Sequence, residues 1–225
     1  MSDLALLIID LQAVYLPGMY RPEPVLTRVA TLADRARAAG APVVYLRQIV
    51  PPDEVPAGVD PRELLGSIAP RPGDVVLDKH SADAFLDTGL ADLLRQRGVR
   101  RIAVTGYSTE MCVDTAVRSG LSAGFDVTLV ADGHLTSVPD DPPAVASGGS
   151  SAAVVPEAAS GGSAGAAARE AATSEPAAPE AARSVPPAEA ALSPEAVVAH
   201  HNRVLGSIGY AHHAVTLARA DEVRF

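Results

Sequence analysis

Uninterrupted hydrophobic runs alternate with amphipathic stretches along most of the chain. The run Leu4–Asp10 is apolar almost throughout, which predicts a strand buried on both faces. Residues Pro22–Gly40 repeat apolar side chains every three or four positions and end at a glycine, which predicts a helix. The same reasoning predicts further strands at Pro42–Arg47, Asp74–Lys79, Arg101–Gly106, Asp126–Asp132 and His213–Ala218.

Helices are predicted between these strands. They lie at Pro61–Ile68, at Leu90–Gly98, from just after Gly106 to about Gly120 or Gly124, and from Ser193 to about Leu205. Ser193 and Pro194 supply an N-cap and a first-turn proline for the last of these. Strands that alternate with helices predict an α/β fold with three layers, in which helices cover both faces of a six-stranded parallel sheet.

One segment, Ser137–Leu192, breaks the alternation. It consists mainly of Ala, Ser, Pro, Gly and Glu, lacks aromatic residues, and carries seven acidic residues against two basic ones. Such a segment buries too little apolar surface to offset the entropy lost on ordering. We therefore predict a single domain over residues 1–225, interrupted at about 137–192 by a disordered insertion; a mobile lid is the alternative.

Composition narrows the range of partners and compartments. The 225-residue chain has a net charge of −9, which argues against binding to nucleic acid or to an anionic membrane. We see neither an export leader nor an apolar run of the ~18 residues that span a bilayer. The single cysteine excludes an internal disulfide, so we expect a soluble, cytoplasmic protein.

Three reactive residue types should meet at one edge of the sheet. Asp10 ends the first predicted strand, Lys79 ends the third, and Cys112 follows the fourth in the first turn of a helix. Parallel strands bring their carboxyl ends to the same edge, where open α/β sheets bind ligands. A helix N-terminus favours a thiolate and offers N–H groups to an oxyanion.

Each of these residues also has an ordinary structural interpretation. A lone cysteine is often a small buried side chain, a strand-end aspartate is often a turn residue, and most lysines are solvated. Convergence favours chemistry, because a carboxylate can take up the thiol proton and return it to a leaving amine. The histidine pairs 200–201 and 212–213 are sequence neighbours that point apart, so we predict no metal site.

Three motifs resemble one family, the isochorismatase-like cysteine hydrolases, which include nicotinamidases and N-carbamoylsarcosine amidases. "LLIIDLQAVY" (Leu6–Tyr15) resembles the opening strand with its Asp-x-Gln. "LDKHSADAFLDTGLADLL" (Leu77–Leu94) resembles the lysine motif, and "VTGYSTEMCVDTA" (Val104–Ala116) resembles the cysteine signature. The resemblance covers Leu4–Asp132 and Ser193–Val223.

The resemblance implies a mechanism and an assembly. Asp10, Lys79 and Cys112 would form the catalytic triad, and the thiolate would attack an amide or ureide carbonyl to give a thioester. A cis peptide would join Tyr107 to Ser108, with Ser108 and Cys112 supplying the oxyanion-hole N–H groups. Members of the family are commonly homodimers or homotetramers, and no cofactor is expected.

The sequence departs from the family pattern at two places. Metal-dependent nicotinamidases carry Asp-x-His after the second strand, where this chain reads "LRQIVPPDEV", so we expect a metal-independent enzyme. The second departure is the insertion. Asp132 and His134 are expected to shape a turn after the fifth strand. By position alone, the candidate substrate-binding residues are Gln12, Tyr15, Arg47, Tyr107 and Thr109, each with a local structural role as the alternative.

We therefore expect a cysteine hydrolase that cleaves a C–N bond of a small amide, ureide or carbamoyl compound. Two alternatives stay open. One is isochorismatase-type hydrolysis of a vinyl ether, which needs the aspartate but no thiol. The other is a catalytically silent member of the family that serves as an interaction scaffold.

Overall fold

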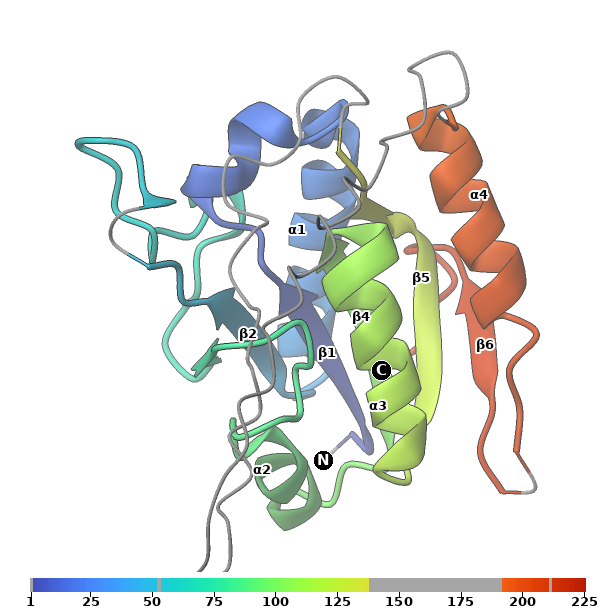
Figure 1. Cartoon of the computed structure of the whole chain (residues 1–225). Helices are drawn as coiled ribbons and strands as arrows, with labels where there is room; N and C mark the ends of the chain where they lie inside the picture. Colours follow the sequence, from blue (N-terminus) through green and yellow to red (C-terminus); the bar gives the residue numbers. More distant parts are fainter. Residues whose placement is uncertain (1, 52–53, 138–191, 211) are drawn as a thin grey trace, which may run out of the picture.

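The structure is a computed structural model that describes residues 2–51, 54–137, 192–210 and 212–225. Six strands form one sheet in the order β3-β2-β1-β4-β5-β6, and all five neighbouring pairs are parallel. The strands are β1 (Leu4–Ile9), β2 (Val43–Gln48), β3 (Val75–Lys79), β4 (Arg101–Tyr107), β5 (Asp126–Leu135) and β6 (Val215–Ala218) (Figure 1). The predicted insertion lies outside the described residues apart from its ends.

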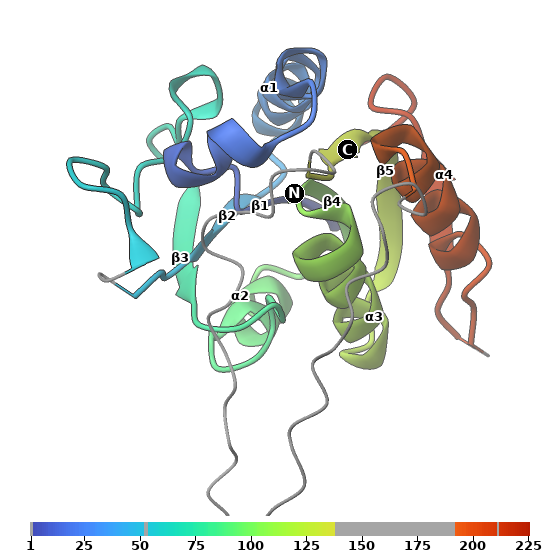
Figure 2. The same cartoon turned by 45° about the horizontal axis from the view of Figure 1, so that its top comes forward.

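Helices cover both faces of the sheet, which confirms the predicted three-layer fold. Helix α1 (Pro22–Ala38) lies on one face, and α2 (Leu90–Gln96), α3 (Asp114–Ser122) and α4 (Pro194–Leu205) lie on the other (Figure 2). Shorter helical segments are η1 (Ala13–Gly18), η3 (Gly66–Ile68) and the π-helical η4 (Thr109–Val113).

Strand β1 lies at the centre of the core because both of its faces are apolar. Leu4, Leu6 and Ile8 pack in the cluster on the α1 side, whereas Leu7 and Ile9 pack in the cluster on the α2 and α3 side. Alternate residues of a strand point to opposite faces, so a continuous apolar run is what a doubly covered strand requires.

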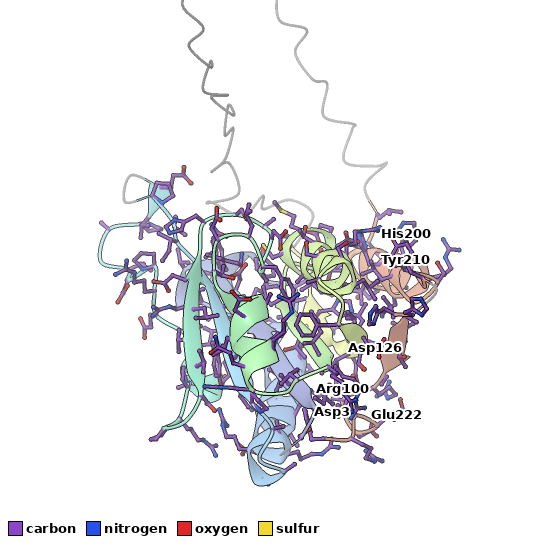
Figure 3. All side chains as sticks on the ribbon, turned by 90° about the horizontal axis from the view of Figure 1, so that it is seen from below. Asp3, Arg100, Asp126, His200, Tyr210 and Glu222 are labelled. Carbon is purple, nitrogen blue, oxygen red and sulfur yellow. The ribbon has the colours of Figure 1, made fainter. Side chains whose placement is uncertain are left out.

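Charged side chains join the strands at the amino edge of the sheet. Asp3 lies beside Arg100, as Figure 3 shows, and accepts hydrogen bonds from Arg100 at 3.1 Å and from Arg101 at 2.7 Å. The carboxyl edge, which holds the candidate catalytic residues, is the opposite one.

The helix predicted at Pro61–Ile68 is wrong for most of its length, since only η3 is helical. The preceding residues pair instead with the segment after β1: Ala13 N donates to Glu63 O at 2.8 Å, and Leu65 N donates to Leu11 O at 3.0 Å. Backbone groups committed to this pairing are no longer available for helical hydrogen bonds.

Strand β5 runs three residues further than predicted, to Leu135, so the prediction that Asp132 and His134 shape a turn is wrong. On β4, Val104 pairs with Leu129 and Gly106 pairs with His134, so a bulge in β5 shifts the register. Gly106 has φ +130°, and a Cβ there would lie 2.1 Å from Ile9 O, so glycine is required at this close approach.

Candidate active site

Asp10 is the first residue after β1 and is almost fully buried. Its backbone has φ 51°, and its amide donates to Leu46 O at 2.9 Å, which fixes the turn that follows the strand. Oδ2 lies 2.7 Å from Nζ of Lys79. Among the described residues Oδ1 has no hydrogen-bond partner of ordinary geometry, although the Cys112 thiol is close enough to influence the pKa of the carboxyl.

Lys79 ends β3 and is completely buried. Its ammonium donates to Gln48 Oε1 at 2.7 Å and to Ser81 O at 3.1 Å, and it also reaches Cys112 Sγ at 3.3 Å. With Asp10, four acceptors surround three N–H protons, so the ammonium is held in one position. Lys79 therefore links the carboxylate to the thiol.

Cys112 is half-buried in η4, which follows β4 after Ser108 and runs directly into α3. Because β1 and β4 are neighbours in the sheet, the turn after β4 comes down beside the residue that follows β1. The structure thus brings together all three residues proposed from the sequence as the triad.

Burial and charge set the protonation states of this cluster. Burial, with a smaller contribution from the charge of Asp10, raises the pKa of the Cys112 thiol to about 12. Burial also raises the pKa of Asp10, although the charge of Lys79 opposes this change. Burial by itself would lower the pKa of Lys79, but the charges of Asp10 and Cys112 outweigh it and raise this pKa. At neutral pH the thiol is therefore protonated and the lysine charged.

The peptide bond between Tyr107 and Ser108 is cis, at the position that the family resemblance implies. Ser108 is buried, and its carbonyl accepts hydrogen bonds from the amides of Met111 at 3.2 Å and Val113 at 3.1 Å. These bonds fold η4 back over Ser108, so the backbone that leads to Cys112 is compact.

Gln12 and Thr109, two of the five candidate substrate-binding residues, are fully buried and have their polar groups engaged within the protein. Gln12 is fully buried, accepts from the amide of Gln48 at 2.8 Å, and donates to the carbonyls of Gln48 and Pro61. Thr109 is also fully buried and bonds to His134.

Arg47 lies on the other face of the sheet from Lys79. Tyr45, two residues earlier on β2, packs in the α1-side cluster, and alternate strand residues share a face. Arg47 forms an ion pair with its cross-strand neighbour Asp78 at 2.7 Å. Its guanidinium is thus partnered on the α1 side.

Tyr15 and Tyr107 lie together near the triad. Their ring centroids are 5.7 Å apart, and both side chains are largely buried. Burial raises the pKa of Tyr15, and the nearby charges of Asp10 and Cys112 raise it further. Tyr107 also shares a 2.8 Å hydrogen bond with Ser137. Tyr15 is therefore close enough to Asp10 and Cys112 to be affected by their charges, and Tyr107 packs against it.

The sequence analysis missed Gln48, which lies between the triad's strands. As the last residue of β2, it sits between the strand of Asp10 and that of Lys79, and its Oε1 accepts from the Lys79 ammonium. Its signal in the sequence was its position at the same carboxyl edge. Its neighbour Arg47 carries the charge at this strand end but points to the other face of the sheet.

The residues directly after β2 lack the Asp-x-His that the family resemblance associates with a metal site. Ile49 and Val50 have no side chain that binds a metal, and the side-chain oxygen of Gln48 already accepts a hydrogen bond from Lys79. Within the described part of the chain, no three His, Cys, Asp or Glu side chains come together to hold a metal ion.

A cavity of about 640 Å³ lies away from this cluster, between α1 and the segment after β6. Arg28, Arg35, Arg219 and Arg224 line it together with Asp132 and Asp221, and none of the triad residues takes part. The cavity is therefore separate from the candidate active site.

None of the helices in the described ranges is both long and apolar enough to cross a membrane.

A parallel sheet whose carboxyl edge gathers a carboxylate, an ammonium and a thiol has the arrangement expected of an α/β cysteine hydrolase. The family-model comparison identifies the family: residues 4–156 match the isochorismatase domain, and the chain belongs to the isochorismatase family.

Relatives with assigned activities share part of the chain. A streptothricin hydrolase of Streptomyces noursei is 40% identical over 136 residues, which cover 59% of this chain and 54% of the relative. Ureidoacrylate amidohydrolase RutB of Methylorubrum extorquens is 30% identical over 155 residues, covering 56% of this chain and 61% of the relative. The chain thus spans little more than half the length of these curated relatives.

A solved structure extends the likeness of fold to nearly the whole chain. The crystal structure of a cysteine hydrolase from Pseudomonas syringae matches with a TM-score of 0.64 and 22% identity, covering 96% of this chain and 90% of that one. At this identity the match shows a shared fold.

Proposed function

We propose that this protein is a cysteine hydrolase that cleaves a C–N bond of a small amide, ureide or carbamoyl compound through a thioester. One observation carries the proposal: Nζ of Lys79 lies 2.7 Å from Asp10 Oδ2 and 3.3 Å from Cys112 Sγ. Lys79 thus contacts both the proposed base Asp10 and the proposed nucleophile Cys112, and the three residues come from separate segments of the chain.

The first step is the attack of sulfur on the carbonyl carbon. Because the Cys112 thiol has a pKa of about 12, it must lose its proton as it attacks. Oδ1 of Asp10 is the acceptor for that proton, since Oδ2 is held by Lys79. The carbonyl oxygen becomes an oxyanion, for which the backbone N–H groups of Ser108 and Cys112 are the proposed donors.

Collapse of this tetrahedral intermediate breaks the C–N bond. Asp10 returns its proton to the nitrogen, the amine or ammonia leaves, and Cys112 holds the acyl group as a thioester. Water then attacks the thioester carbonyl while Asp10 takes up one of its protons. Expulsion of the sulfur, which regains the proton, releases the acid and restores the enzyme.

Lys79 has an electrostatic role in both steps. Its charge holds Asp10 ionised despite the burial that raises the pKa of that carboxyl, and it stabilises negative charge developing on the sulfur. A fully buried ammonium interacts strongly because water does not screen it.

The named relatives support the substrate class. Streptothricin hydrolase and ureidoacrylate amidohydrolase are both hydrolases by name, and the second is named for an amide-type bond. We infer a small substrate that contains an amide, ureide or carbamoyl group. The predicted homodimer or homotetramer belongs to the same proposal.

Because Cys112 is the only cysteine, the thioester can be tested without ambiguity. We would screen a panel of amides and ureides for the release of ammonia or amine. The reaction would then be quenched in acid and the mass of the intact protein measured by mass spectrometry. The proposal expects an acyl adduct on the wild type and none on Cys112→Ala, which should also lose activity. Equal turnover by the two proteins would exclude the thioester, and vinyl-ether cleavage that depends on Asp10 alone would favour the isochorismatase reaction.

A further inference from the structure

A chain of hydrogen bonds, buried at Thr109 and His134 and partly buried at Asn202, connects the nucleophile segment η4 to helix α4. Oγ1 of Thr109, the first residue of η4, lies 2.8 Å from Nδ1 of His134 on β5. Nε2 of His134 lies 3.0 Å from Oδ1 of Asn202 on α4. The Asn202 amide group donates in turn to Ala131 O at 2.9 Å. Thr109 and His134 are both buried.

The hydrogen-bond chemistry sets the direction of each donation. Nδ2 of Asn202 is committed as a donor to a backbone carbonyl, so Oδ1 faces His134 and accepts from Nε2–H. A neutral imidazole that donates from Nε2 must accept at Nδ1. The Thr109 hydroxyl is therefore the donor to His134, and its rotamer is fixed.

His134 keeps this tautomer across the physiological range. Burial lowers its pKa to about 4, with Asn202 raising the pKa in opposition. The other groups that act on it are His201 from α4, which lowers the pKa, and Asp132 from β5, which raises it. The imidazole is therefore neutral at neutral pH.

We propose that Thr109, His134 and Asn202 form a positioning relay that holds the nucleophile segment in place for the transition state. Thr109 follows the proposed oxyanion donor Ser108 and opens the turn that carries Cys112. Fixing its side chain fixes the backbone on which both proposed N–H donors lie. The relay rests on the proposed function, and none of its members touches the substrate.

The relay assigns roles that the sequence and the family match leave open. Asn202 lies outside the matched residues 4–156, in the helix after the long segment that the structure does not describe. Thr109 is a candidate substrate-binding residue by its position in the sequence. It becomes a positioning residue because its hydroxyl donates a hydrogen bond to His134.

The first test removes the relay's first hydrogen bond. Thr109→Val keeps the shape of the side chain but not the hydroxyl, and we expect kcat to fall about 10- to 100-fold with KM within about threefold. Thr109→Ser restores the hydroxyl and should recover most of the activity. The matched control is Thr105→Val, which removes another fully buried threonine hydroxyl, one that donates to Leu7 O at 2.8 Å. It should lose stability but keep its kcat.

The second test changes the pH response. Asn202→Asp places a carboxylate against Nε2 and should raise the pKa of His134 well above the wild-type value of about 4. Below the new pKa, Nδ1 carries a proton and can no longer accept from Thr109. The ratio of variant to wild-type kcat should therefore fall as the pH is lowered. A purely structural effect predicts a ratio that does not change with pH.

The outcomes separate the relay from the enzyme proposal. If Cys112→Ala abolishes turnover while Thr109→Val and Asn202→Asp match the wild type at every pH, the relay is wrong and the hydrolase stands. If Cys112→Ala retains full turnover, the proposed function itself fails. Circular dichroism and thermal melting of each variant show whether it is folded when assayed.

Discussion

Oδ2 of Asp10 lies 2.7 Å from Nζ of Lys79, and 3% and 0% of the two side chains are exposed. Two opposite charges so deeply buried depend on each other, because each compensates part of the cost of removing the other from water. The pair joins the first residue after β1 to the last residue of β3, across the end of β2. The central part of the carboxyl edge is therefore held together by charges that the proposed chemistry also uses.

Lys79→Met should lower the free energy of unfolding and should also abolish the proposed hydrolytic activity. Removal of one partner leaves the buried Asp10 charge uncompensated, at a cost of about 3–5 kcal/mol in the free energy of unfolding. Urea denaturation measures this cost. The matched control is Arg118→Ala, which breaks an exposed ion pair with Asp114 and should cost about 1 kcal/mol or less. Similar losses for both variants would contradict the coupling of Asp10 and Lys79.

Asp10→Asn should increase the rate at which iodoacetamide alkylates Cys112. The same substitution should abolish hydrolysis of the substrate. The charge of Asp10 raises the pKa of the thiol, so its removal increases the thiolate fraction at a given pH. Lys79→Met should have the opposite effect on alkylation, because the charge of Lys79 lowers that pKa. Alkylation rates of the lone cysteine, followed by mass spectrometry against pH, check both signs. Slower alkylation of Asp10→Asn would contradict this electrostatic account.

His134 should make the stability of the fold depend on pH under mildly acidic conditions. Burial lowers its pKa from 6.5 to about 4, so the unfolded chain binds a proton more readily. The stability contributed above pH 6.5 is therefore lost as the pH falls through about 4. The free energy of unfolding should decrease more steeply over this range for the wild type than for His134→Gln. Parallel curves from urea titrations would show that His134 does not titrate as described.

Gly106→Ala should prevent the turn that leads to Ser108 from forming. The new methyl group would lie 2.1 Å from Ile9 O, at a φ of +130° that L residues rarely adopt. We expect a loss of at least about 3 kcal/mol in the free energy of unfolding, or no soluble protein. Gly66→Ala is the control, because nothing lies within 4 Å of its added Cβ. Normal melting of Gly106→Ala would mean that β1 and β4 can separate there.

The sequence was sufficient for the residues whose positions follow from the parallel strands. Asp10 and Lys79 end apolar runs, and Cys112 follows a third run, so parallel pairing alone brings them to one edge. The helix predicted at Pro61–Ile68 failed because residues 63–65 pair with residues 11–13, which is a long-range contact that local spacing does not record.

The chain's hydrophobic pattern by itself determined the six strands, the helices α1 to α4 and the edge at which the reactive residues collect, because the spacing of apolar residues is a local property of each segment. Only the tertiary structure decided which side chains meet there. Gln48 and Arg47 are neighbours in sequence, yet they diverge to opposite faces of β2. His134 reaches Thr109 only through the bulge in β5, and Asn202 reaches His134 only because α4 packs beside that strand. Such contacts depend on register and on packing between distant segments, which no local pattern encodes.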